Sequence, residues 1–68
     1  MTLFDLPLQP LDDGRYVVLV NHEAVPGFDT RTQALAHAVA QAAELAERGL
    51  ASAIHIEGGD GRWRTYRG

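Results

Sequence analysis

The order of apolar and polar positions divides the chain into strand-like and helix-like segments. The clearest strand signal is the run 16–20, Tyr-Val-Val-Leu-Val, which is β-branched and apolar at every position. A strand with one face in water alternates, so this run predicts a strand that is buried on both faces. One helix can cover one face. We expect the other face to be covered by the apolar arm Leu3–Leu8, by a partner chain, or by both.

The segments before this strand predict an extended arm and a turn. Residues 1–10 alternate leucines with Pro7 and Pro10. Since proline donates no hydrogen bond to a ladder, we expect an extended arm or an edge strand here. The run 12–14, Asp-Asp-Gly, is typical of a turn that joins two strands.

A third strand is predicted over residues 23–28. Asn21 and His22 form a plausible two-residue connection to it, since asparagine tolerates a positive φ. Pro26 and Gly27 weaken this strand, which favours an edge position or a bulge.

The single helix is predicted from about residue 31 to residue 48. Thr30 is expected to cap it by accepting from the amide of Gln33, while the Gln33 side chain reaches back to the amide of Thr30. Gly49 is a typical helix stop. The predicted buried stripe is Leu35, Ala38, Val39, Ala42, Leu45 and Ala46. The predicted polar face is Gln33, His37, Gln41, Glu44 and Arg48.

A hairpin is predicted at the end of the chain. Residues 53–57 alternate, with Ile54 and Ile56 inward and His55 and Glu57 outward. The glycine-rich run 58–61 predicts the turn, and residues 62–66 the returning strand. The chain is therefore predicted to be one α+β domain over 1–68. We expect an antiparallel sheet of four or five strands with one amphipathic helix on one face, in the order β-β-β-α-β-β.

Charge and composition narrow the classes of function. The formal net charge of −3 argues against general attraction to nucleic acid or anionic membranes, and no apolar stretch approaches the ~20 residues of a bilayer span. No signal-peptide pattern is present at the start, and the chain contains no cysteine. We expect a soluble cytoplasmic protein, because the lack of cysteine is compatible with that compartment.

The chain contains the residue types of a metal site and of a hydrolytic triad, but not at the spacing that either site needs. A metal site needs at least three converging ligands, and His55 with Glu57 on one strand face supplies only two. His22 could join them if its strand end lay nearby, whereas His37 is expected to be remote on the helix. Ser52, His55 and Asp60 lack the nucleophile elbow of a hydrolase. A chain of this length also leaves little room for a closed pocket. We predict no enzymatic activity, no cofactor and no metal site.

The most unusual exposed element is the basic strand at the end of the chain. Its possible interaction surface is Arg62, Trp63, Arg64, Tyr66 and Arg67. The arginines could contact phosphates and the aromatic rings could stack on bases. Alternatively, Trp63 packs in the core against the helix and the arginines keep an edge strand soluble.

The chain resembles a family of small bacterial domains of unknown function. The matching residues are Tyr16 and Val18, Phe28-Asp29-Thr30 with Ala34, Ile54-His55, and Asp60-Gly61-Arg62. This resemblance implies a fold and no activity. A weaker resemblance, to the sheet-and-helix domain of HicB-type antitoxins, is carried by residues 14–18, by Pro26-Gly27, and by the Thr30-capped helix with Ala34-Leu35. It implies a regulator that binds a small ribonuclease partner.

Taken together, these patterns predict a small non-enzymatic binding or assembly module that acts through protein–protein contacts. The doubly apolar strand favours a homodimer, since two-fold dimers are the commonest oligomers. The alternative is an antitoxin-like or nucleic-acid-linked regulator that uses the basic strand.

Overall fold

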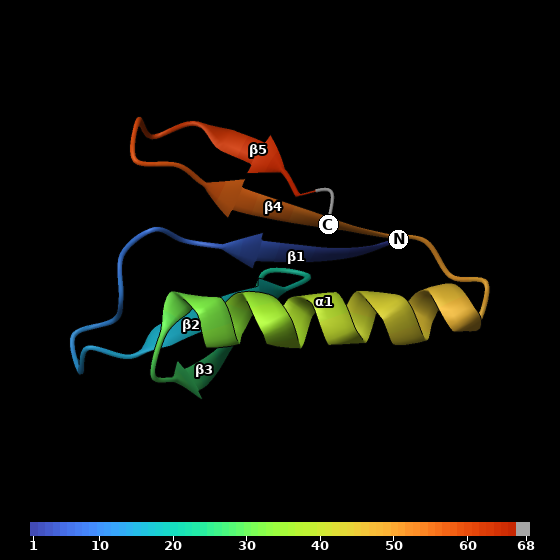
Figure 1. Ribbon diagram of the computed structural model, residues 1–68, viewed down its shortest axis with the longest axis horizontal. Coiled ribbons are helices and arrows are strands. Elements are labelled where there is room, and N and C mark those ends of the chain that lie inside the picture. The colour runs from blue at the N-terminus through green and yellow to red at the C-terminus, as the bar shows by residue number, and fades with distance from the viewer. Residues whose placement is uncertain (67–68) are drawn as a thin grey trace.

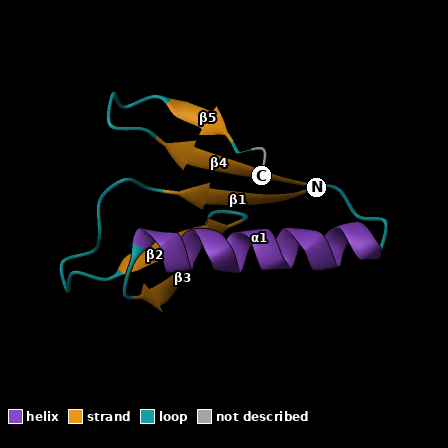
Figure 2. Ribbon diagram, viewed as in Figure 1, coloured by secondary structure: helices purple, strands orange, loops and turns teal. Residues whose placement is uncertain are grey.

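The protein folds as one helix packed on one face of a five-stranded sheet (Figures 1 and 2). This computed structural model describes residues 1–66. Its strands are β1 (Thr2–Leu6), β2 (Tyr16–Val20), β3 (Glu23–Phe28), β4 (Ser52–Glu57) and β5 (Trp63–Thr65), and its helix is α1 (Arg31–Glu47). The α+β class and the predicted order of strands and helix are confirmed.

The sheet is mixed, which corrects the expectation of a wholly antiparallel one. Its strand order is β3-β2-β1-β4-β5, and the β1–β4 pair is parallel while the other three pairs are antiparallel. It follows that β3 and β4 run in the same direction. A hairpin cannot join two such strands, so α1 forms a crossover connection between them.

The N-terminal segment is the centre of the sheet, and the prediction of an edge strand or a separate arm was wrong. β1 lies between β2 and β4. Pro7 and Pro10 follow the end of β1 and therefore remove no ladder hydrogen bond. At the start of β1, the Leu3 amide donates to Asn21 Oδ1 at 2.9 Å, and the Asn21 amide donates to the Leu3 carbonyl at 2.8 Å.

The predicted hairpin between β2 and β3 is confirmed. Asn21 and His22 have φ values of 50° and 71°, the positive values that a tight two-residue turn of this kind requires. β3 is an edge strand, and the β2–β3 register shifts between Tyr16 and Val17. Pro26 therefore lies on an outer strand, as predicted.

Thr30 caps the helix as predicted. Its Oγ1 accepts from the Gln33 amide at 3.1 Å. Gln33 Oε1 accepts from the amide of Asp29 at 3.0 Å, one residue before the predicted donor Thr30. Gly49, with φ of 74°, follows the last turn as the predicted stop.

The buried face of α1 is rotated about the helix axis relative to the predicted stripe. Ala34 and Ala38 are buried, and Leu35, Ala42 and Leu45 pack beside them. Val39 and Ala46 are exposed, so their predicted burial was wrong. The helix rests on its i, i+4 row of small alanines, because this row allows the closest approach to the sheet.

The core lies between α1 and the covered face of the sheet. Its buried cluster consists of Phe4, Leu6, Val18, Ala34, Ala38 and Ile54. No polar side chain of residues 1–66 is buried. The core is therefore held by apolar packing alone.

Candidate functional site

The sheet face opposite α1 is open. The helix contacts β1 to β4 on the covered face, and β5 lies beyond it (Figure 1). Since strand side chains alternate between faces, the register places one row of side chains across all five strands on the open face. From β3 to β5, this row is Ala24, Leu19, Asp5, His55 and Thr65.

A hollow of about 350 Å³ lies on this open face. Its walls are Asp5, Leu19, His55 and Trp63, which come from four different strands. Trp63 pairs with Glu57, two residues along β4 from His55, and its side chain remains 49% exposed. We call these four residues the open-face hollow.

Two titratable side chains meet in the open-face hollow. His55 Nδ1 lies 3.3 Å from Asp5 Oδ1, and the two side chains are 35% and 19% exposed. The parallel register of β1 and β4 pairs these residues directly, although 50 positions separate them in the sequence. Sequence reasoning identified His55 but missed Asp5. The available signal was a single carboxylate within the apolar run 3–6, Leu-Phe-Asp-Leu.

Three hydrogen bonds hold the ends of β1 and β4 together. The Arg31 guanidinium donates to the carbonyls of Leu6 and Glu57. Glu57 Oε1 accepts from the Leu8 amide at 2.9 Å. These contacts tie the parallel pair to the first turn of the helix. We assign them to stability of the fold.

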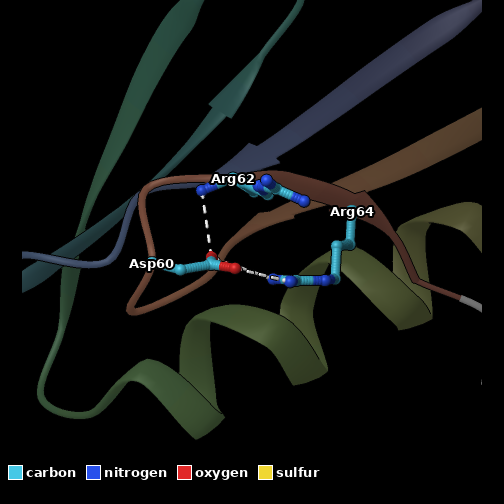
Figure 3. A network of polar contacts seen from close by, with 3 residues as sticks. All are labelled: Asp60, Arg62 and Arg64. Atoms are coloured by element: carbon cyan, nitrogen blue, oxygen red, sulfur yellow. Dashed lines mark hydrogen bonds and ion pairs between the residues drawn. The ribbon is translucent and has the colours of Figure 1, made fainter.

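The basic strand carries an ion pair of its own (Figure 3). Arg64 donates to both carboxylate oxygens of Asp60, at 3.1 and 2.7 Å, and the Arg62 amide donates to Asp60 Oδ1 at 3.1 Å. The Arg64 hydrogen bonds, followed by the Arg62 amide, lower the pKa of Asp60 to about 2. The same pair raises the pKa of Arg64.

Among the described residues, the predicted interaction surface is divided between the two faces of the sheet. Arg64 pairs across the strands with Ile56 on the covered side, and Tyr66 packs against the core. Trp63 projects from the open face, so its alternative placement in the core against the helix was wrong. Arg62 is exposed, and Arg67 lies outside the described residues.

The three histidines lie apart. His22 is in the β2–β3 turn, His55 contacts Asp5, and His37 is half-buried with its ring 5.2 Å from that of Phe28. His37, which was predicted on the polar face, is thus partly covered by Phe28. Within residues 1–66, no three histidine or carboxylate side chains gather as metal ligands would.

The three residues with hydrolase side chains are not brought together either. Ser52 and His55 are three positions apart on β4 and so point to opposite faces of the sheet. Asp60 is engaged by Arg64. The carboxylate that contacts His55 is Asp5 instead.

Comparison with known proteins found no matching family model, no matching curated protein and no matching solved structure. In the part of the chain that the structure describes, no helix is long and apolar enough to cross a membrane.

Proposed function

We propose that this protein is a small non-enzymatic binding module that acts through protein–protein contacts on the open face of its sheet. We further propose that it forms a homodimer through this face. The half-exposed Trp63, which lines the open-face hollow together with Leu19, is the observation that carries the proposal. Tryptophan is enriched at protein interfaces because it buries a large apolar area and keeps a polar N–H.

The composition of the open face supports this proposal. A sheet face that only meets water is expected to be polar. By strand alternation, the open face instead carries apolar side chains on all five strands: Leu3, Val17, Leu19, Ala24, Ala53 and Trp63. Val17 is buried, with 6% exposure, so its apolar side chain is explained by folding. Leu3, Leu19, Ala53 and Trp63 are not buried and lie outside the core cluster on the other side of the sheet. An apolar face of this kind is typical of a protein-binding surface.

The alternative, an antitoxin-like or nucleic-acid-linked regulator, is less well supported. Arg64 is already paired with Asp60, which reduces the charge available to a phosphate. Tyr66 packs against the core, so its ring is not free to stack on a base. Trp63 and Arg64 point to opposite faces, so one strand of nucleic acid cannot use both. We also propose a cytoplasmic location, with which the lack of cysteine is compatible.

Light scattering at micromolar concentration tests the homodimer. We expect about twice the mass of the chain, as for a two-fold dimer. Trp63→Glu should return the protein to the monomer, because it places a charge in the proposed interface. A monomeric mass for the unmodified protein across the micromolar range would contradict the homodimer.

Val39→Glu is the matched control. Val39 is 38% exposed, like Trp63 an exposed large apolar residue, but it lies on the helix and hence on the other side of the molecule. We expect this variant to remain dimeric. If Val39→Glu also produced a monomer, the interface would lie on the helix layer.

A further inference from the structure

The open-face hollow contains a carboxylate that is largely withdrawn from water. The Asp5 side chain is 19% exposed, and His55 Nδ1 contacts one of its two oxygens, Oδ1. The ion pairs of arginine among residues 1–66 are Arg15 with Asp29 and Arg64 with Asp60, so none reaches Asp5. Withdrawing a carboxylate from water is costly unless an opposite charge or donors compensate it. The second oxygen of Asp5 is therefore the strongest polar recognition group of the hollow.

Aromatic and aliphatic walls stand beside this carboxylate. Trp63 contributes an indole that remains 49% exposed, and Leu19 lies beside Asp5 on the neighbouring strand. The face of an indole attracts cations more strongly than any other side-chain ring. A carboxylate next to an indole and a leucine suits a ligand with an apolar stem and a positively charged end.

We propose that the open-face hollow binds the basic side chain of an arginine or lysine from the partner protein. The hydrocarbon stem lies along Leu19 and Trp63, and the charged group bonds to Asp5 Oδ2, the oxygen that His55 does not contact. This inference depends on the proposed protein-binding role and specifies the chemistry of the partner. The hollow, of about 350 Å³, lies near the lower end of the ~300–1,000 Å³ typical of ligand sites, so it suits one side chain.

Charge complementarity selects this occupant over two others. An acidic side chain would be repelled by Asp5 and by a chain of net charge −3. A purely apolar side chain would cover Asp5 without compensating its charge. A basic side chain satisfies the carboxylate and buries its stem in the same step.

The test uses the single tryptophan of the chain as its reporter. N-acetyl-arginine amide is titrated against Trp63 fluorescence, and N-acetyl-citrulline amide serves as the uncharged probe of similar shape. We expect saturable binding of the arginine probe in the millimolar range and binding of the citrulline probe about 5–30-fold weaker. Equal binding of the two probes, or no saturable response to arginine amide, would overturn the proposal.

Asp5→Asn, which keeps the side-chain shape, should reduce the arginine preference to about that of the neutral probe. Asp12→Asn makes the same charge change in the exposed turn before β2 and should leave the preference intact. Equal losses in both variants would show a general charge effect and overturn the site. If Asp5→Asn does not fold, Trp63→Leu is tested instead, and arginine binding is followed through the NMR signals of the His55 ring. It should weaken arginine binding several-fold, and unchanged binding would overturn the proposal.

Repeating the titration at low and high micromolar protein concentration separates this inference from the proposed homodimer. If the dimer covers the hollow, arginine amide competes with the second copy and binds more weakly at high protein concentration. If the chain is monomeric by light scattering but still prefers arginine over citrulline, the proposed homodimer is contradicted and the proposed binding of a basic side chain in the hollow is supported. If the chain is dimeric and shows no preference for arginine at either protein concentration, only the proposed binding of a basic side chain in the hollow is overturned.

Discussion

The two faces of this sheet are built from the same strands and yet differ in kind. The covered face is closed by α1 and holds the buried cluster that includes Phe4, Leu6 and Val18. The open face carries a tryptophan that is 49% exposed and an Asp5–His55 contact. Packing accounts for every buried residue of the covered face. The open face carries an exposed tryptophan and a partly covered carboxylate that packing against α1 does not require, and both features favour a binding role.

A buried charge gives the largest expected difference between the two faces. Ala38→Glu places a carboxylate at a position with 0% exposure under the helix, in a domain small enough to be marginally stable. We expect no cooperative unfolding transition in circular dichroism. Val39→Glu, one residue on and 38% exposed, should unfold cooperatively near the unmodified protein. Similar behaviour of the two variants would show that the helix face is assigned wrongly.

Truncating leucines on opposite faces of β1 is the next comparison. Leu6 is 1% exposed on the covered face, and Leu6→Ala should cost ~2–5 kcal/mol of unfolding free energy. Leu3 is half-buried on the open face, and Leu3→Ala should cost about 1 kcal/mol, because less area is lost from packing. Urea denaturation measures both. A larger loss at Leu3 would place the core on the wrong side of the sheet.

The helix cap should matter less than the core and should leave the open face unchanged. Thr30→Ala removes the oxygen that accepts from the Gln33 amide and should cost about 1 kcal/mol in urea denaturation. Thr32→Ala, two residues on within the helix, is the control and should be near neutral. A Thr30→Ala variant as stable as the control would show that the cap contributes nothing.

The Asp60–Arg64 pair should give the smallest effect, because it lies at the surface. NMR titration of the Asp60 carboxyl should give a pKa of about 2, and Arg64→Gln should raise that pKa towards the ordinary 3.8. Since the pKa is lower in the folded state, the pair stabilises the fold above about pH 3.8, and this stabilisation is lost as the pH falls through about 2.

Arg48→Gln removes a distant exposed arginine and is the control for this pair. It should leave the Asp60 titration unchanged. An unchanged titration in Arg64→Gln would show that the ion pair does not form in solution. Within pH 2–4, Arg64→Gln should also flatten the pH dependence of stability slightly relative to Arg48→Gln.

Features that depend on neighbouring residues could be predicted from the sequence. Thr30 and Gly49 bounded the helix, and Asn21 with His22 fixed the β2–β3 turn. The alternation of Ile54 and His55 gave the two sides of β4. These features follow from hydrogen bonds and φ values set within a few residues, so the local sequence carries all the information they need.

The pairing of β1 with β2 and β4 became known only from the three-dimensional arrangement of the whole chain. This arrangement placed β1 at the centre, made its pairing with β4 parallel, and so brought Asp5 to His55. Trp63 was identified from the sequence as part of a surface. Its position on the open face, in the hollow that Asp5 also lines, was not predicted. The reason is physical: a strand can pair through either edge and in either direction, and the choice depends on how the whole core packs.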